Sequence, residues 1–438
     1  MKRVVFAWLL ALLLLSACEN TAAVSLEASP AGEISLRENG QDKNMNAFRI
    51  ITATDIHFIS PVLTDQGEFF TRLVTYGDGK AMPFINEITE AFADRVIREA
   101  PDLVILSGDL TFNGASRSHT DMASKLSRLE KAGIPVLVIP GNHDIGRTGA
   151  AMFRGNTYTR VPSPDADTFR RIYRDYGPDE AESRDPVSGS YTWRAEEDLL
   201  ILMLDTNSGA ENALPEESFP WLENVLKTAA EAGTRVIAVS HQNLYIHNEA
   251  YHQGVVIDNA PRVAALYEKY GVLLNLSGHM HMQHMEEDRP VPDMATASLA
   301  VYPHRFGLIT VDDDGLVYET RDLDVSAWAA EKGLTDPRLL DFDAWSGTFF
   351  EETMERQAWN RAEKLEGFTE AEKKEMVRAM VRVSSAYFQG IPVDPDSIRE
   401  GILLWSRVLE TGYSAYVESI RADLEKDHRH LEIGARRE

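Results

Sequence analysis

The chain is poor in cysteine and in positive charge, and each shortage excludes a class of protein. Cys18 is the single cysteine in 438 residues, so no disulfide can form within the chain. Lysine and arginine number 44 against 69 aspartate and glutamate, which gives a formal net charge of -25. Binding to a nucleic-acid polymer requires a basic stripe, and none appears, so we expect no such partner. An anionic phosphate substrate would have to be attracted by local charge, such as bound cations.

A long apolar run is found at the N-terminus. Lys2 and Arg3 precede the run, which is short for a membrane span and is followed by small residues, as in secretory signal peptides. Its last residues, Leu-Ser-Ala-Cys, resemble the lipobox of bacterial lipoproteins. That resemblance implies a signal peptide of residues 1–17 and a diacylglyceryl anchor on Cys18, at the extracytoplasmic side of the cell membrane. The alternative is a transmembrane anchor with an incidental cysteine. Residues 18–47 are polar without apolar periodicity, and we expect a flexible tether.

From residue 48 onward, short β-rich apolar runs alternate with amphipathic helical stretches. The runs show no strict polar alternation, which is typical of strands buried on both faces. They are residues 48–54, 103–107, 134–139, 199–204, 235–240 and 272–277. A hairpin is predicted over residues 306–320, around an Asp-Asp-Asp-Gly turn. The pattern predicts an α/β catalytic domain with a sheet core over residues 48–322.

The composition changes after residue 322, and residues 323–438 are predicted to form a helical domain without strands. Thr369 and Glu372 form a capping-box signature. The helix that follows carries its apolar side chains on one face over residues 376–387. A second helix is predicted over residues 395–424. The methionine and aromatic side chains of this part are interpreted as core packing.

Polar residues follow one predicted strand after another. They are Asp55 and His57 after the first strand, Asp109 after the second, Asn142, His143 and Asp144 after the third, His241 after the fifth, and His279 and His281 after the sixth. In open α/β sheets, ligands bind at the carboxyl edge of the strands. Each motif alone is usually a turn or a satisfied buried group. Their recurrence at one edge indicates a shared site.

The ordered set D-x-H, G-D, G-N-H-D, H and G-H-x-H resembles the calcineurin-like metallophosphoesterase superfamily, over about residues 48–320. The resemblance implies a β-sandwich flanked by helices and two metal ions. It assigns Asp55, His57 and His281 to one ion, Asn142, His241 and His279 to the other, and Asp109 to both. Oxygen and nitrogen donors without thiolate suit two divalent transition-metal ions, Mn or Fe, with Zn possible. Such a pair supplies a nucleophile at neutral pH and neutralises charge on phosphorus.

His143 and Asp144 are the residues we expect to act beside the metals. His143 would stabilise phosphate oxygens or protonate the leaving alkoxide. Asp144 would orient His143 through a ring nitrogen, the alternative being a cap at a helix start. His279 and His281 are alternate residues, which point to opposite sides of an extended chain and so could serve different ions.

Departures from neighbouring families narrow the reaction. Phe112 stands where purple acid phosphatases have a tyrosine ligand, and Asn113 stands where protein serine/threonine phosphatases have an arginine that clamps phosphate. G-D-L-T-x-x-G with G-N-H-D resembles the class III cyclic-nucleotide phosphodiesterases. This implies phosphodiester hydrolysis, with a cyclic nucleotide as the leading substrate. The alternatives are a broad phosphomonoesterase, a phospholipid-headgroup phosphodiesterase, and a lipoprotein that binds phosphate compounds without cleaving them. Intact Asp109 and His143 argue against the last of these.

Other residues have weaker claims. The loop over residues 60–80 follows His57, is rich in glycine and aspartate, and is a candidate determinant of specificity. Four side chains near the ligand motifs are as suited to a structural role as to substrate contact: Tyr245, His247, Tyr302 and His304. The remaining histidines, which include His119, His284 and His428, are interpreted as surface residues.

Overall fold

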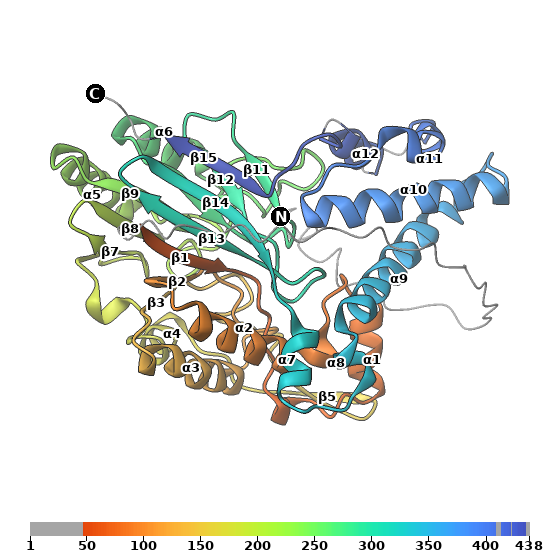
Figure 1. Ribbon diagram of the computed structural model, residues 1–438, viewed down its shortest axis with the longest axis horizontal. Coiled ribbons are helices and arrows are strands. Elements are labelled where there is room, and N and C mark those ends of the chain that lie inside the picture. The colour runs from red at the N-terminus through yellow and green to blue at the C-terminus, as the bar shows by residue number, and fades with distance from the viewer. Residues whose placement is uncertain (1–46, 409–412, 422, 435–438) are drawn as a thin grey trace, which may run out of the picture.

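Two β-sheets packed face to face form the centre of the computed structural model, which describes residues 47–408, 413–421 and 423–434 (Figure 1). The first sheet has the order β15-β14-β13-β1-β2-β3 and the second the order β11-β12-β10-β9-β8-β7-β6. The first contains β1 (Phe48–Ala53), β2 (Leu103–Leu106), β3 (Val136–Val138), β13 (Arg305–Asp312), β14 (Gly315–Asp322) and β15 (His430–Gly434). The second contains β6 (Ser183–Arg184), β7 (Tyr191–Glu196), β8 (Leu199–Leu204), β9 (Arg235–Ser240), β10 (Leu274–Ser277), β11 (His284–Glu286) and β12 (Asp293–Ala295).

The inner faces of the two sheets bury a continuous apolar core. Isoleucines and leucines of both sheets meet there, among them Ile50, Ile105, Leu137, Ile201, Ile237, Leu276 and Ile309. Strand β8 is buried at all of its positions, because helices cover the face that the sandwich leaves outside. Double-sided burial explains why the strand sequences lack polar alternation.

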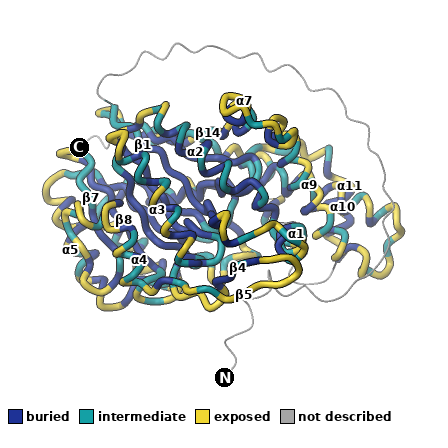
Figure 2. The backbone as a smooth tube through the Cα atoms, turned by 90° about the horizontal axis from the view of Figure 1, so that it is seen from below, coloured by how far each residue is buried: buried dark blue, intermediate teal, exposed yellow. Residues whose placement is uncertain are grey.

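Helices cover the outer face of each sheet. Helices α2 (Ile85–Glu99) and α3 (Ser116–Lys131) share a core with β1 and β2, and α5 (Phe219–Glu231) and α6 (Ala260–Tyr270) share one with β8 and β9. Smaller elements complete this part: α1 (Glu68–Thr75), β4 (Ala151–Arg154), β5 (Thr157–Arg160) and α4 (Ala166–Ile172). In Figure 2 the central strands are buried and the exposed residues gather on the outer turns. The predicted fold class, a metallophosphoesterase-type sandwich flanked by helices with a C-terminal helical region, is confirmed.

The C-terminal part is largely helical. It contains α7 (Val325–Glu331), α8 (Pro337–Leu340), α9 (Phe342–Ala362), α10 (Glu370–Gln389), α11 (Arg399–Trp405) and α12 (Tyr413–Arg421). The predicted capping box is present, with Glu372 N donating to Thr369 Oγ1 at 3.2 Å and Thr369 N donating to Glu372 Oε2 at 2.7 Å. No helix among the described residues is long and apolar enough to cross a membrane.

Two expectations for this part are wrong. The single helix predicted over residues 395–424 is instead a 3-10 turn (Pro395–Ser397) followed by the separate helices α11 and α12. The part was also predicted to lack strands, yet β15 pairs antiparallel with β14 and becomes the edge of the first sheet. The C-terminal segment therefore returns to the catalytic sandwich.

A buried cluster of histidines and aspartates also joins the C-terminal part to the sandwich. Asp423 Oδ2 accepts from His284 Nε2 at 2.5 Å and from His428 Nε2 at 2.8 Å. The chain of contacts continues through His247, whose Nδ1 lies 2.9 Å from His284 Nδ1 and whose Nε2 lies 3.1 Å from Asp293 Oδ2. The interpretation of His284 and His428 as surface residues is wrong, since both are buried.

This cluster has metal-ligating residue types, but its hydrogen bonds do not fit a metal. The backbone N–H of Met285 donates to His428 Nδ1 at 3.2 Å, which places the ring proton of His428 on Nε2. That proton faces Asp423, so Nε2 has no lone pair to offer. The cluster is a hydrogen-bonded clasp between the two parts of the chain.

Candidate metal centre

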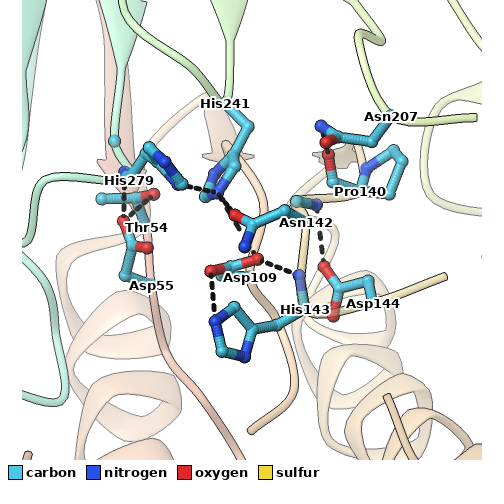
Figure 3. Close-up of polar contacts among 12 residues, drawn as sticks. Thr54, Asp55, Asp109, Pro140, Asn142, His143, Asp144, Asn207, His241 and His279 are labelled. Atoms are coloured by element: carbon cyan, nitrogen blue, oxygen red, sulfur yellow. Dashed lines mark hydrogen bonds and ion pairs between the residues drawn. The ribbon is translucent and has the colours of Figure 1, made fainter. Parts of the chain in front are cut away.

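The seven predicted ligands meet at the carboxyl edge of the sheets. Six of them form two groups that share Asp109, and Asn142 joins the second group through His241. Figure 3 shows five of the seven: Asp55, Asp109, Asn142, His241 and His279. In the first group, His281 Nε2 lies 3.0 Å from His57 Nε2 and 3.3 Å from Asp55 Oδ1. Asp109 Oδ2 lies 3.8 Å from His57 Nε2. In the second group, Asp109 Oδ1 lies 3.4 Å from His241 Nε2. One carboxylate thus faces both groups with different oxygens.

Five of these seven residues adopt an unusual backbone conformation. Positive φ angles occur at Asp55 (50°), His57 (49°), Asp109 (47°), His279 (69°) and His281 (63°). This left-handed region is costly for residues with a side chain, and such residues cluster at functional sites. It also corrects our reasoning for His279 and His281. They do face different groups, but because each backbone turns sharply and not because the chain is extended.

Glycines allow the strand ends to converge. A Cβ on Gly141 would lie 2.2 Å from Asp109 Oδ1, and a Cβ on Gly278 would lie 2.0 Å from Thr54 Oγ1. Thr54 Oγ1 in turn donates to Asp55 Oδ2 at 2.7 Å. A larger residue would not fit at either position, because side chains of the site approach the backbone too closely for a Cβ atom.

The hydrogen bonds of His241 direct a lone pair into the second group. Its Nδ1 donates to Ser107 O at 2.9 Å, so Nε2 faces Asn142 Oδ1 at 3.1 Å and Asp109 Oδ1 at 3.4 Å. Three lone-pair atoms face one another here, which requires a proton or a metal cation between them. Burial lowers the pKa of His241, but Asp109 more than offsets this and the pKa rises to about 9. The electrostatics of this point therefore favour a positive charge.

His279 is also oriented by a hydrogen bond from one ring nitrogen to a backbone carbonyl, but here the donor is Nε2 and not Nδ1. Its Nε2 donates to Gly254 O at 3.0 Å, and its Nδ1 points to His241 Nε2 at 3.1 Å. Burial, followed by the charge of His241, lowers the pKa of His279 to about 4, so its Nδ1 lone pair is free. A backbone carbonyl on the distal nitrogen is the usual way in which proteins hold a metal-binding histidine.

The first group contains a buried carboxylate oxygen without a hydrogen bond in the described part of the chain, 3.3 Å from His281 Nε2. Asp55 Oδ1 is buried and has no hydrogen-bond donor among the described residues, whereas Oδ2 accepts from His279 N at 2.8 Å. A buried, unpaired carboxylate oxygen is expensive. Burial would also raise the pKa of Asp109, but His241 and His143 lower it well below its usual range. Burial would likewise raise the pKa of Asp55, but His281 lowers it below its usual value. Both carboxylates are therefore ionised, and the donor set fits two divalent cations.

His143 is the most accessible of the predicted catalytic side chains, with 34% of the side chain exposed. Its backbone N–H donates to Asp109 Oδ1 at 2.7 Å, and its Nδ1 donates to Phe112 O at 2.8 Å. The remaining nitrogen, Nε2, lies 3.9 Å from Asp109 Oδ2 and is free for a ligand. Burial of the ring lowers the pKa of His143, which favours the neutral ring with its proton on Nδ1. The ring can therefore protonate a leaving group only after Nε2 has taken up a second proton.

Asp144 does not orient His143, and that expectation is wrong. Its Oδ1 accepts from Thr111 N at 2.9 Å, and its Oδ2 accepts from Gly141 N at 2.9 Å and from Leu110 N at 3.1 Å. Burial and the nearby Asp109 raise the pKa of Asp144 to about 7, while these hydrogen bonds favour the ionised form. Asp144 therefore ties the loop after β2 to the loop after β3, and Phe112 O orients His143.

Several residues of the site have no signal in the predicted motifs. Ser298 Oγ donates to Asp55 O at 2.8 Å. His119 is buried, and the expectation of a surface residue is wrong; its Nε2 donates to Asp144 O at 2.9 Å. Asp78 Oδ2 lies 3.6 Å from His281 Nδ1. For Asp78, the only signal in the sequence was its position in the glycine- and aspartate-rich loop over residues 60–80.

The four side chains that suited a structural role and substrate contact equally well all make contacts within the protein. His304 Nδ1 donates to Leu299 O at 3.0 Å, His247 belongs to the clasp described above, and Tyr302 packs beside Phe350. Tyr245 stacks with Arg289.

The chain belongs to the calcineurin-like phosphoesterase family, whose model matches residues 48–283. This family uses a pair of divalent metals. Residues 324–427 match a second model, the C-terminal domain of cyclic nucleotide phosphodiesterase. The protein is therefore a metallophosphoesterase-superfamily hydrolase with a phosphodiesterase-type C-terminal domain.

Individual relatives are distant. The "Probable glycerophosphodiester phosphodiesterase GpdQ" of Arcobacter nitrofigilis is 25% identical over 246 residues, which cover 55% of this chain and 78% of that protein. Among solved structures, a dimetal phosphatase from Danio rerio has a TM-score of 0.47 and 14% identity, covering 63% of this chain and 96% of that one. GAP50 of Plasmodium has a TM-score of 0.41 and 13% identity, covering 63% and 85%.

Proposed function

We propose that this protein hydrolyses phosphodiesters, with cyclic nucleotides as the leading substrate class. The observation that carries the proposal is the match of residues 324–427 to a cyclic nucleotide phosphodiesterase domain, in the same chain as the catalytic family. The distant likeness to a glycerophosphodiester phosphodiesterase supports the diester. Asn113 also supports it, because its Nδ2 donates to Ala151 O at 3.0 Å and provides no clamp for a monoester dianion.

The side chains divide into holding and acting roles. Asp55, His57 and His281 would hold one divalent cation, Asn142, His241 and His279 the other, and Asp109 would touch both. When bound, such a pair activates the attacking nucleophile and neutralises charge on the phosphoryl group. His143 presents Nε2 at the open side of the centre, where, once protonated, it can donate a hydrogen bond to a phosphate oxygen or give a proton to the leaving oxygen.

The test is a substrate profile of the purified protein after loading with Mn, Fe or Zn. We expect hydrolysis of a chromogenic diester and of a 3′,5′-cyclic nucleotide with kcat/KM well above that for the matching monoester. A preference for monoesters would replace the proposal with a phosphomonoesterase. Binding of phosphate compounds without turnover by any of the three metal forms would replace it with a binding lipoprotein.

We also propose that the protein is anchored by lipid at Cys18, on the extracytoplasmic face of the cell membrane. The Leu-Ser-Ala-Cys sequence supports this, and it lies outside the described residues. Two acyl chains hold a protein stably at a membrane, whereas one does not. Wild type and Cys18→Ser are compared in a bacterial host by membrane fractionation and by mass analysis of the mature N-terminus. Equal release of both proteins, with Cys18 unmodified, would contradict the anchor.

A further inference from the structure

The segment over residues 75–81, at the end of the loop that follows His57, is bound to the C-terminal part. Helix α9 reaches it with two side chains: Arg356 Nη2 donates to Thr75 O at 2.9 Å, and Gln357 Nε2 donates to Gly77 O at 3.0 Å. Both contacts fix the backbone and not the side chains of the segment. The C-terminal part therefore determines where this stretch of the catalytic part lies.

Helix α9 also packs closely against the middle of the segment, at Gly79. Gly79 has a φ of +87°, and a Cβ there would lie 2.8 Å from Cδ2 of Phe350, a fully buried residue of α9. Only glycine fits such a position. On its other side, Lys80 forms an antiparallel bridge with Val301. The backbone that carries residues 78 and 80 is thus held from two sides.

The two side chains held in this way lie against the metal centre. Lys80 forms an ion pair with Asp78 Oδ2, and that oxygen lies 3.6 Å from Nδ1 of His281. Lys80 is only 7% exposed. The buried ion pair of Lys80 and Asp78 therefore lies beside His281, a predicted ligand of the first group.

Lys80 has unused hydrogen-bonding capacity. An ammonium group has three donors, and Asp78 is the hydrogen-bond partner that the described residues give it. Asp78 balances the charge of the ammonium, but the donors left over need a further acceptor, and an anion held by the two cations would provide one. A phosphate group held by the cations is such an anion.

We propose that Lys80 donates a hydrogen bond to a non-bridging phosphate oxygen of the substrate, and that Asp78 is the positioning residue that holds Lys80 there. The inference rests on the proposed phosphoesterase function and names part of its specificity. A lysine provides a point charge and not the two-pronged clamp of an arginine, so it suits the single negative charge of a diester. It also gives the C-terminal part a role, because α9 fixes the segment that carries both residues.

The probe is inorganic phosphate, and binding to the Mn-loaded full-length protein is measured by calorimetry alongside metal content. Lys80→Met is expected to weaken phosphate binding roughly tenfold to a hundredfold, the worth of one charge-assisted hydrogen bond, with metal content unchanged. Lys80→Arg should recover part of the loss. Lys373→Met is the matched control, since Lys373 is 8% exposed but lies in α10 and donates to Glu363 O. If Lys80→Met fails to fold, Lys80→Gln takes its place.

Phosphate affinity of Lys80→Met within about twofold of wild type would overturn the proposal, since a charge-assisted hydrogen bond is worth more. Loss of metal from Lys80→Met would overturn it too, because Lys80 would then act through His281. For Asp78, Asp78→Asn should raise KM for a chromogenic diester while kcat changes little, and Asp78→Glu should restore KM. A wild type that binds phosphate through Lys80 but cleaves no ester would refute the proposed function and leave this inference standing. If Lys80→Met cleaves diesters as well as the wild type does, the inference is refuted and the proposed function stands.

Discussion

Gly141→Ala is the smallest change that should disable both metal positions at once. Its Cβ would lie 2.2 Å from Asp109 Oδ1, 2.3 Å from Asp109 N and 2.7 Å from His241 Nε2. Van der Waals contacts of this kind require more than 3 Å, so the carboxylate or the loop must move by roughly 1 Å. The backbone atom among these neighbours cannot turn away as a flexible side chain could.

The size of the effect follows from which residue is displaced. Asp109 faces both ligand groups, so a shift of roughly 1 Å misplaces both cations, and such a shift can lower turnover by about 10²-fold. Overpacking a tight site costs about 1–3 kcal/mol of stability, which leaves a protein of this size folded. We therefore expect a folded variant with reduced metal content and a kcat/KM about a hundredfold lower.

Gly149→Ala is the control, because Gly149 lies in the same loop and its Cβ would meet only Arg160 Nη1, at 3.7 Å. The assays are elemental analysis of the purified proteins, thermal unfolding, and kinetics with a chromogenic diester. The reasoning is refuted if Gly141→Ala matches Gly149→Ala in metal content and in kcat/KM.

Three further outcomes are expected. Exhaustive chelation should abolish hydrolysis, and Mn or Fe should restore it; full activity in metal-free protein would contradict the mechanism. Asp109→Asn should impair turnover more than the loss of any ligand that belongs to only one of the two groups. His143→Gln should keep its metals but lose roughly two to four orders of magnitude in turnover, less for esters with good leaving groups, and loss of metal would show that His143 is a ligand. In the clasp, burial would raise the pKa of Asp423, but His284 and His428 hold it well below its usual range. The ionised Asp423 therefore stabilises the folded protein above about pH 4, and this contribution is lost as the pH falls further. Asp423→Asn should therefore lower the melting temperature at pH 7 and have less effect near pH 3; equal shifts at both would rule out an ionised Asp423.

The strand runs and the ligand set could be predicted because their signals are local. A strand buried on both faces has to be apolar throughout, as β8 is, and a ligand that follows a strand lies next to it in the sequence. The capping box at Thr369 is likewise contained in four residues. These patterns predicted an α/β organisation with a sheet core, and the sandwich of two sheets was implied by the resemblance to the metallophosphoesterase superfamily.

The remainder depended on contacts between distant parts of the chain. His284 meets Asp423 across 139 residues, and neither residue lies in a motif, so no local pattern marks the clasp. Asp144 binds backbone N–H groups, which every residue except proline carries, so the side chains of its partners give no signal in the sequence. Strand β15 alternates charged with apolar residues in a short segment, and it is a strand because β14 offers it an unpaired edge.

The pairing of β15 with β14 also sets the order in which the molecule can be completed. Strand β1 is made first, but its antiparallel neighbour β13 follows only after the second sheet, and the edge beside β14 stays open until the last residues of β15 appear. An open edge invites pairing with other chains, and a topology dominated by distant contacts folds slowly. A ribosome-bound chain that lacks its C-terminus would thus expose this edge, and removal of residues 430–434 should favour aggregation even though these residues lie away from the metal centre.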